Sequence, residues 1–272
     1  MDGVGEANGA VAGTSPRTWP VRLLAVLAAF GLVYFPGLGA VDLASATVGL
    51  PSRDELVSMR AAYGLVVGFL LPATLFLLAA RPTGAAASVQ QVLAVAVAFL
   101  LTAVASGLWT ALVGGVGLLA LGAALGRLAS GELGAAPAAS DAHRPLLVLT
   151  GLGAIPWLVY AGMMALRQRS GTGPYEDFTL GVQGWSALTV FALVMVLNSI
   201  LSAFRPPGWR AVLLATGVAS LLFGLVGMWA DEVPGSPGQA WGAAAVLWGA
   251  ALASSPWIAW RMPARDRHSR MQ

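Results

Sequence analysis

The residues with the clearest chemical potential gather in one loop and in the two apolar segments beside it. Tyr175, Glu176 and Asp177 precede an apolar segment in which Trp185 lies two turns in, and Tyr160 lies in the second half of the preceding apolar segment. Carboxylates beside aromatic rings attract cations through charge and cation–π contact. These residues predict a site for a cation or a cationic organic molecule. The alternative is ordinary loop acidity beside an aromatic belt, with Asp177 capping a helix.

A second candidate pair, Asn198 and Ser202, lies four residues apart, so the two side chains share one face of a helix. They could line a polar path through the molecule. The more common role of such residues between apolar helices is an interhelical hydrogen bond, worth about 0.6 kcal/mol on average. The pattern therefore favours helix packing.

Several kinds of chemistry are excluded by residue types that are missing. The chain has no cysteine and no lysine, so it offers no thiolate ligand, cysteine nucleophile, Schiff base or phosphate-binding lysine. Its two histidines, His143 and His268, lie in polar segments, and no ionisable Asp, Glu, Arg or His lies deep inside an apolar run. We therefore expect no cofactor, no metal site and no enzymatic activity.

The composition predicts a protein embedded in lipid. Hydrophobic residues make up 57% of the 272 residues and charged residues 10%, whereas soluble domains carry about 25% charged residues. Apolar runs long enough to cross a bilayer follow one another along the chain. The predicted fold class is all-α, a polytopic membrane bundle of about eight helices, with runs at 21–40, 61–80, 88–127, 145–166, 180–203, 211–229 and 240–260. The run 88–127 is twice the required length, so we predict two helices that turn at Ser106-Gly107.

Two short motifs help to define where the first two predicted helices begin and end. Ser52 and Glu55 form a capping box, which predicts that the second helix begins near residue 53. Ala44-Ser45-Ala46 has the small residues of a signal-peptidase site, but the first apolar run is longer than a signal peptide and follows a long tail. We therefore expect an uncleaved first helix.

Charge predicts the orientation. With the N-terminus in the cytoplasm, eight helices place 11 of the 15 arginines on the inside and 4 outside, as the positive-inside rule requires. We expect a cell membrane location of the bacterial inner-membrane type, with both termini cytoplasmic. The arginines are scattered at the ends of apolar runs, which argues against nucleic acid as a partner.

The chain divides into two possible halves. We predict a disordered tail (1–18), a first membrane half (19–127), a cytoplasmic linker (128–144), a second membrane half (145–260) and a basic tail (261–272). Arg81-Pro82-Thr83-Gly84 and Arg205-Pro206-Pro207-Gly208 end equivalent helices. This repeated R-P-x-G suggests two parallel four-helix halves, although arginine followed by proline is also an ordinary helix stop.

Small residues predict close helix packing. Gly64 and Gly68, Gly122 and Gly126, and Ser220 and Gly224 recur at four-residue spacing, which lets helix backbones approach closely. Trp241-Gly242 and Trp248-Gly249 repeat after seven residues and predict one tight helix–helix contact. Packing within the bundle is the expected role, and an interface between proteins is the alternative.

The second half, about residues 145–260, contains Pro156-Trp157-Leu158-Val159-Tyr160 and the segments 176–181 and 241–249. In these motifs it resembles multi-pass membrane proteins of unknown activity from GC-rich actinobacteria. It implies a membrane location and no particular activity, and it transfers no catalytic residue.

Three functions remain open. The first is a transporter-like or small-solute-binding protein with an outward-facing site between the fifth and sixth predicted helices. The second is a non-catalytic membrane subunit or scaffold that packs through its small-residue faces. The third is a membrane enzyme acting on lipid. This chain lacks the acidic pairs and the nucleophile at membrane depth that such an enzyme would need. The expected partners are the lipid bilayer, a small molecule or cation, and another membrane protein.

Overall fold

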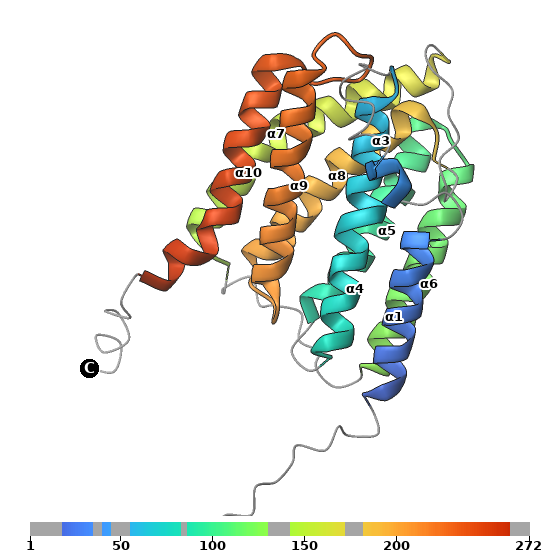
Figure 1. Cartoon of the computed structure of the whole chain (residues 1–272), viewed down its shortest axis with the longest axis vertical. Helices are drawn as coiled ribbons and strands as arrows, with labels where there is room; N and C mark the ends of the chain where they lie inside the picture. The colour runs from blue at the N-terminus through green and yellow to red at the C-terminus, as the bar shows by residue number, and fades with distance from the viewer. Residues whose placement is uncertain are drawn as a thin grey trace, which may run out of the picture.

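The computed structural model describes residues 18–34, 40–44, 55–82, 86–129, 142–171 and 182–261, and in these ranges the chain is helical without β-strands (Figure 1). The predicted tails and most of the predicted linker lie outside the described residues. Residues 40–44 form one helical turn. The other elements are α1 (Trp19–Tyr34), α3 (Val57–Tyr63), the π-helix η1 (Gly64–Leu70), α4 (Leu71–Ala80), α5 (Ala86–Ser106), α6 (Thr110–Leu128), α7 (Arg144–Arg169), α8 (Gly184–Ala203), α9 (Trp209–Trp229) and α10 (Gly238–Arg261).

Six helical segments in the described part of the chain are long and apolar enough to cross a membrane. They are Val57–Ala80, which joins α3, η1 and α4, followed by α5, α6, α7, α8 and α9. The all-helical class is confirmed, whereas the predicted count of about eight spans is not, since six helices in the described part of the chain qualify. The remaining two predicted spans are present as helices. At 16 residues α1 is about 24 Å long, less than the ~30 Å of a bilayer core. The 24 residues of α10 include Gln239, four tryptophans and several Gly and Ser residues, which lower its hydropathy.

The second predicted helix begins later than its capping box suggested. It starts at Val57 and not near residue 53, and its N-cap residue, Leu56, forms no side-chain capping hydrogen bond. The helix continues to Ala80 despite Pro72, because the segment before the proline is π-helical. Proline has no N–H to donate to the carbonyl four residues earlier, and the wider π turn shifts the hydrogen bonds around it.

The tight turn between α5 and α6 lies where the sequence predicted it. The helix α5 ends at Ser106, and Gly107 follows with a φ of 70°. Only glycine adopts this left-handed conformation at little cost. The 40-residue apolar run is therefore a helical hairpin.

The helix at the centre of the bundle is α8, in which 16 of 20 residues are buried. It packs against α3 and α5 from the first predicted half and against α7 and α9 from the second. The two predicted halves thus share one core around α8. Whether they are structural repeats of each other stays a prediction.

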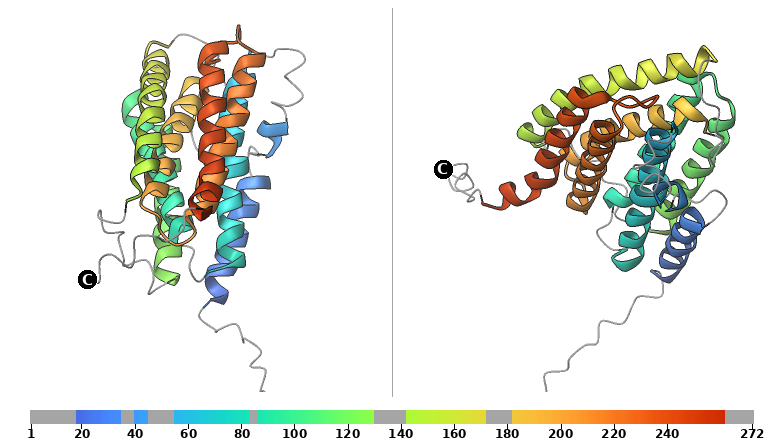
Figure 2. Two further views of the ribbon diagram at one scale, coloured as in Figure 1. Left: turned by 90° about the vertical axis from the view of Figure 1, so that its left-hand side faces the viewer. Right: turned by 45° about the horizontal axis from the view of Figure 1, so that its top comes forward.

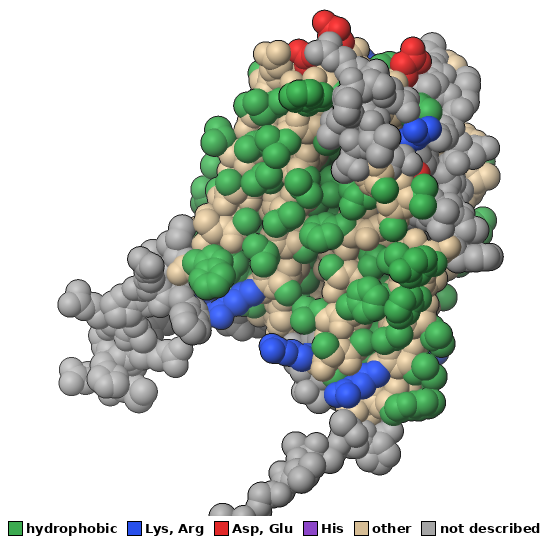
Figure 3. Space-filling model, viewed as in Figure 1, with side chains coloured by type: hydrophobic (Ala, Val, Ile, Leu, Met, Phe, Trp, Pro, Cys, Tyr) green, Lys and Arg blue, Asp and Glu red, His purple; other side chains and the backbone are tan. Residues whose placement is uncertain are grey.

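The bundle has two chemically different ends. At the lower end of Figure 1, where α5, α7 and α9 begin, the N–H of Ala87 bonds to the carbonyl of Pro207 and that of His143 to Ala203, each at 2.9 Å. Acidic side chains lie at the upper end, basic side chains lie mainly along the lower end but also near the upper end, and apolar side chains cover the face between them (Figure 3). An apolar outer surface of this extent suits a bundle surrounded by lipid.

Glycines hold α9 and α10 together at very short range. A Cβ atom on Gly217 would lie 2.6 Å from the carbonyl oxygen of Gly249, and one on Gly249 would lie 2.5 Å from that of Gly217. Gly224 and Gly242 form an equivalent pair, at 2.6 and 2.8 Å. Both pairs lie seven residues apart on each helix. This confirms the tight contact that the Trp-Gly repeat predicted.

Other small residues also pack inside the bundle. The hydroxyl of Ser220 donates to the carbonyl of Ala245 at 2.9 Å. Gly122 lies against α5, and Gly64 lies against the backbone of the helical turn 40–44. For these residues, packing within the bundle is the role that the structure shows.

Candidate functional site

A groove lies between α7 and α10. The two helices lie beside each other at one side of the bundle (Figure 2). The groove has a volume of about 590 Å³, within the roughly 300–1,000 Å³ usual for small-molecule sites. Its lining is almost entirely apolar and comprises Leu149, Leu152, Gly153, Pro156, Trp157, Tyr160, Pro237, Ala240, Trp241, Ala244, Ala245, Leu247, Trp248 and Ala251.

The groove exists because small residues of α10 leave space beside the larger side chains of α7. Ala240, Ala244 and Ala251 of α10 lie on one helical face, since they are spaced by four and seven residues. Helices separated by aromatic side chains at a few positions and by methyl groups elsewhere leave a cavity between them.

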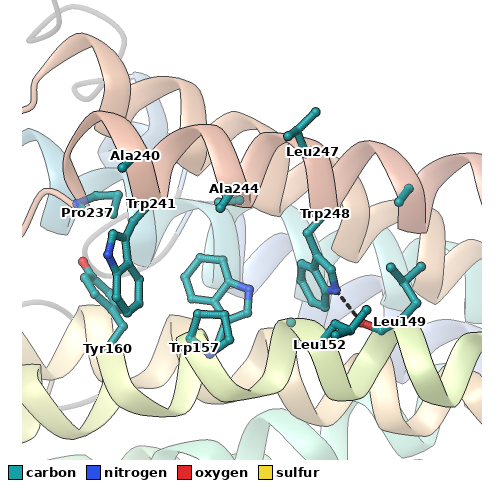
Figure 4. Close-up of a pocket in the computed structure, with 14 residues that line it drawn as sticks. Leu149, Leu152, Trp157, Tyr160, Pro237, Ala240, Trp241, Ala244, Leu247 and Trp248 are labelled. Atoms are coloured by element: carbon teal, nitrogen blue, oxygen red, sulfur yellow. Dashed lines mark hydrogen bonds between the residues drawn. The ribbon is translucent and has the colours of Figure 1, made fainter.

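Trp248 closes one end of the groove (Figure 4). Its indole N–H donates to the carbonyl of Leu149 at 2.8 Å, which fixes the ring across the two helices. The ring lies directly over Gly153, where an added Cβ would be 2.1 Å from Cε2 of the indole. Glycine is therefore required at position 153 for this arrangement.

The floor of the groove is a cluster of aromatic rings from four helices. Trp157 lies 5.5 Å from Phe191, 6.0 Å from Phe223 and 6.3 Å from Trp248, measured between ring centroids. Phe191 and Phe223 are 4.5 Å apart. Such pairs add about 0.5–1.5 kcal/mol each beyond their area burial. The cluster gives the groove a firm inner wall.

The opposite end of the groove carries its polar groups. The hydroxyl of Tyr160 donates to the carbonyl of Gly235 and so joins α7 to the loop between α9 and α10. Gly235 has a φ of 79°, which suits glycine. Trp241 stands beside Tyr160 (Figure 4), and its indole N–H forms no hydrogen bond to a described residue. The side chain of Trp241 is 43% exposed.

The residues of the predicted cation site have different surroundings. Tyr160 is buried and lines the groove. Trp185 is also buried, and the guanidinium of Arg167 lies 4.9 Å from its ring centroid. That arginine already provides a cation for the Trp185 ring. The predicted site residues 175–177 lie outside the described residues, and the cation site as a whole stays a prediction.

Asn198 and Ser202 are both fully buried in α8. Neither side chain forms a hydrogen bond to another described residue, so the expected interhelical bond is absent from this part of the chain. Gln91 of α5 is also buried and accepts from the Thr74 hydroxyl at 2.5 Å, while its Nε2 has no such partner. An unsatisfied buried polar group costs about 1–3 kcal/mol.

The groove itself was not predicted from the sequence. The alanines at 240, 244 and 251 were the available signal, but an alanine face predicts tight packing as readily as a hollow. Within the described ranges no group of three acidic or histidine residues is placed to hold a metal ion. The groove therefore offers an apolar shape and aromatic faces.

These features define an all-helical protein whose six long apolar helices suit a membrane, with one lateral aromatic groove. No protein-family model matches the chain, and neither do the curated proteins or the solved structures. The resemblance to actinobacterial membrane proteins stays a prediction.

Proposed function

We propose that this chain is a non-enzymatic, eight-helix integral membrane protein that binds a lipid-like small molecule in the groove between α7 and α10. The ligand would be mostly apolar with one group that accepts a hydrogen bond. The observation that carries the proposal is the apolar lining of a cavity of about 590 Å³. Apolar pockets with a few polar groups are the usual form of small-molecule sites.

The surroundings of the groove suggest how a ligand enters. Leu152 and Leu247 on its lining are 67% and 72% exposed, and the exposed residues near them on both helices are mostly apolar. In a membrane this side of the bundle would face lipid, so an apolar molecule could enter laterally without crossing water. The indole N–H of Trp241 would then receive an acceptor group on the ligand.

This site replaces the sequence-based position between the fifth and sixth helices as the better candidate for small-solute binding. It shares Tyr160 with the earlier set and adds Trp157, Trp241 and Trp248. The scaffold alternative has less support because the glycines of α9 and α10 pack against each other inside the bundle. A lipid-acting enzyme has the least, since Tyr160 is the one ionisable residue in the lining.

We further propose that the protein lies in a cell membrane of the bacterial inner-membrane type with both termini in the cytoplasm. The arginine distribution supports this orientation, with 11 of 15 on the proposed inner side. A topology reporter fused after Gly235 should then report an outside position, and one fused after Arg205 an inside position. The reverse result would refute the orientation.

Ligand binding can be tested by filling the groove. Ala244 lines it and is exposed, so Ala244→Leu should fill part of the cavity without disturbing the core. The matched control is Ala123→Leu on the exposed face of α6. We expect dodecanol, a chain with one polar end, to raise the melting temperature of the purified wild type and of Ala123→Leu, but not of Ala244→Leu.

Two outcomes would contradict the proposal. Equal stabilisation of all three proteins would show that dodecanol binds outside the groove. A wild type whose melting temperature is not raised by any alcohol of eight to eighteen carbons would show that the groove does not bind a lipid-like ligand. Because the added leucine faces a cavity, Ala244→Leu alone should leave the melting temperature nearly unchanged. That measurement separates lost binding from misfolding.

A further inference from the structure

A stripe of polar side chains runs the length of α5 on its buried side. It consists of Ser88, Gln91, Thr102 and Ser106, which are at most 4% exposed. With about 3.6 residues per turn, these four positions fall within an arc of about 60° around the helix. At about 1.5 Å per residue the stripe is about 27 Å long, close to the ~30 Å thickness of a bilayer core. We call these four residues the polar stripe.

Every member of the polar stripe has a side-chain atom without a hydrogen-bond partner among the described residues. These atoms are the hydroxyl oxygens of the serines and the threonine, and Nε2 of Gln91. Asn198 and Ser202 of α8, which packs against α5, are buried and unpaired in the same way. The N–H of Ala87 bonds to the carbonyl of Pro207, so Gln91 and Ser202 both lie within about two helical turns of this bond. Because each unpaired group costs about 1–3 kcal/mol, the close packing of α5 against α8 is not the arrangement that satisfies them.

One side-chain contact joins the polar stripe to α4. The hydroxyl oxygen of Thr74 lies 2.5 Å from Oε1 of Gln91 and 2.7 Å from the carbonyl oxygen of Leu70. A hydroxyl group has one hydrogen, so it donates to only one of these two oxygens at a time. The contact between α4 and α5 can therefore break while Thr74 keeps its bond to Leu70 within its own helix.

The helix that carries Thr74 has a natural place to bend. The π-helix η1 lies near the middle of the span Val57–Ala80. The N–H of Leu71 bonds to the carbonyl of Val66, five residues earlier, and Pro72 has no N–H for the next bond. Helices bend most often at prolines and π turns. Before η1, α3 packs against α8 and α9, whereas after η1, α4 packs mainly against α1. The second half of this span is therefore held less firmly to the centre of the bundle than the first half.

The chemistry of the unpaired groups favours a neutral ligand. Hydroxyl groups donate and accept hydrogen bonds, and the amides of Gln91 and Asn198 combine N–H donors with an oxygen acceptor. A cation would use only the oxygens, and an anion would use only the N–H and O–H groups. The helices α4, α5 and α8 contain no charged residue that would neutralise an ion. Water both donates and accepts, and a buried water makes about three hydrogen bonds to otherwise unpaired groups.

We propose that the polar stripe is one wall of a water path through the bundle, and that the path opens when α4 swings away from α5 about η1. The closely packed arrangement in Figure 1 is the closed state. Opening exchanges the contact of Thr74 with Gln91 for hydrogen bonds from water to the stripe and to Asn198 and Ser202. The path rests on the proposed membrane location, but it is separate from the groove between α7 and α10 and does not depend on a ligand there.

The absence of cysteine from the sequence allows a direct test. Ser88→Cys, Ser106→Cys and Ser202→Cys each introduce one thiol in place of a hydroxyl, and Ala96→Cys is the control. Ala96 is fully buried on α5 but lies outside the arc of the polar stripe. The variants are reconstituted in phosphatidylcholine vesicles and treated at pH 8 with 2-hydroxyethyl methanethiosulfonate, a small neutral thiol reagent. We expect the three serine positions to react about tenfold faster than Ala96→Cys, because a thiol in apolar surroundings forms little of the reactive thiolate.

The possible results separate the water path from simpler explanations. Reaction at the serine positions that is as slow as that of Ala96→Cys would overturn the proposal. Equally fast reaction at all four positions would also overturn it, because the bundle would then be loose throughout. Reaction at Ser88→Cys and Ser202→Cys without Ser106→Cys would indicate a local pocket and not a path. Flotation of the vesicles on a density gradient checks the membrane location separately, and protein that does not float would refute that location and the path with it.

The bend at η1 has its own test. Pro72→Ala restores an N–H to the helix, so it should hold α4 more firmly in the closed state. Added to Ser88→Cys, it should slow the labelling about threefold to tenfold, the rate change that corresponds to one backbone hydrogen bond. The melting temperature of the double variant shows whether it is folded. A folded double variant that reacts as fast as Ser88→Cys alone would overturn the opening motion at η1.

Discussion

Replacing Gly153 by alanine tests the contact that shapes the groove. The new Cβ would lie 2.1 Å from Cε2 of Trp248, whereas ordinary contact begins at 3.4 Å. The indole must therefore move by at least 1.3 Å, the difference between these two distances. A shift of this size breaks its 2.8 Å hydrogen bond to the carbonyl of Leu149. The ring would also lose its packing against Trp157.

The expected cost follows from three contributions. Overpacking strain costs about 1–3 kcal/mol, and the lost hydrogen bond costs about 0.5–1.5 kcal/mol. Alanine improves helix propensity over glycine by about 1 kcal/mol, which offsets part of this loss. We expect a net destabilisation of about 2 kcal/mol, or a fall in melting temperature of about 4–8 °C for a chain of this size.

The assay is thermal unfolding of the detergent-solubilised protein, followed by the fluorescence of its ten tryptophans. The chain offers two controls on the same helix, because a Cβ on Gly151 or Gly162 would meet nothing within 4 Å. Gly151→Ala and Gly162→Ala should leave the melting temperature unchanged or raise it slightly. Equal stability of Gly153→Ala and Gly151→Ala would refute the proposed contact with Trp248. In a Trp248→Phe background, the Gly153 substitution should cost less, since the two side chains are coupled.

Three further predictions concern other parts of the bundle. Gly217→Ala should destabilise the protein by about 1–3 kcal/mol, because its Cβ would lie 2.6 Å from a carbonyl oxygen of α10. Thermal unfolding checks this, with Gly117→Ala as the control because its Cβ would meet nothing within 4 Å. Asn198→Leu should raise the melting temperature, since it removes a buried amide without a described partner, at a gain of about 1–3 kcal/mol; a marked fall would show that the amide is satisfied. Burial, followed by the charge of Arg205, lowers the pKa of His143, so the unfolded chain binds a proton more tightly. The contribution of His143 to stability should therefore be fully present above about pH 6.5 and be lost as the pH falls. Melting temperatures measured from pH 7.5 to 5 should decline less in His143→Asn than in the wild type. An equal decline in the two proteins would contradict the prediction.

Local sequence information was enough to predict most of the helices. Residues 88–127 had to form a hairpin because a single helix would be twice as long as a bilayer core is thick, and Gly107 supplied the turn. Glycines spaced by seven residues predicted the contact of α10, since that spacing returns each glycine to the same helical face. The count of spans was not confirmed by the structure. The helix α1 is shorter than a bilayer core is thick, and α10 has a lowered hydropathy.

The tertiary structure decided where those faces meet. Leu149 and Trp248 are 99 residues apart in the chain and form one hydrogen bond, while Arg167 of α7 covers Trp185 of α8. Helical spacing shows which residues share a face but not which other helix that face contacts. For this reason the sequence predicted a cation site from residues 175–177 and Trp185 without showing that Arg167 lies over the Trp185 ring. For the same reason it gave no sign that the alanine face of α10 lines a cavity. The sequence determined a set of apolar helices with small-residue contacts, and their arrangement in space created the aromatic groove.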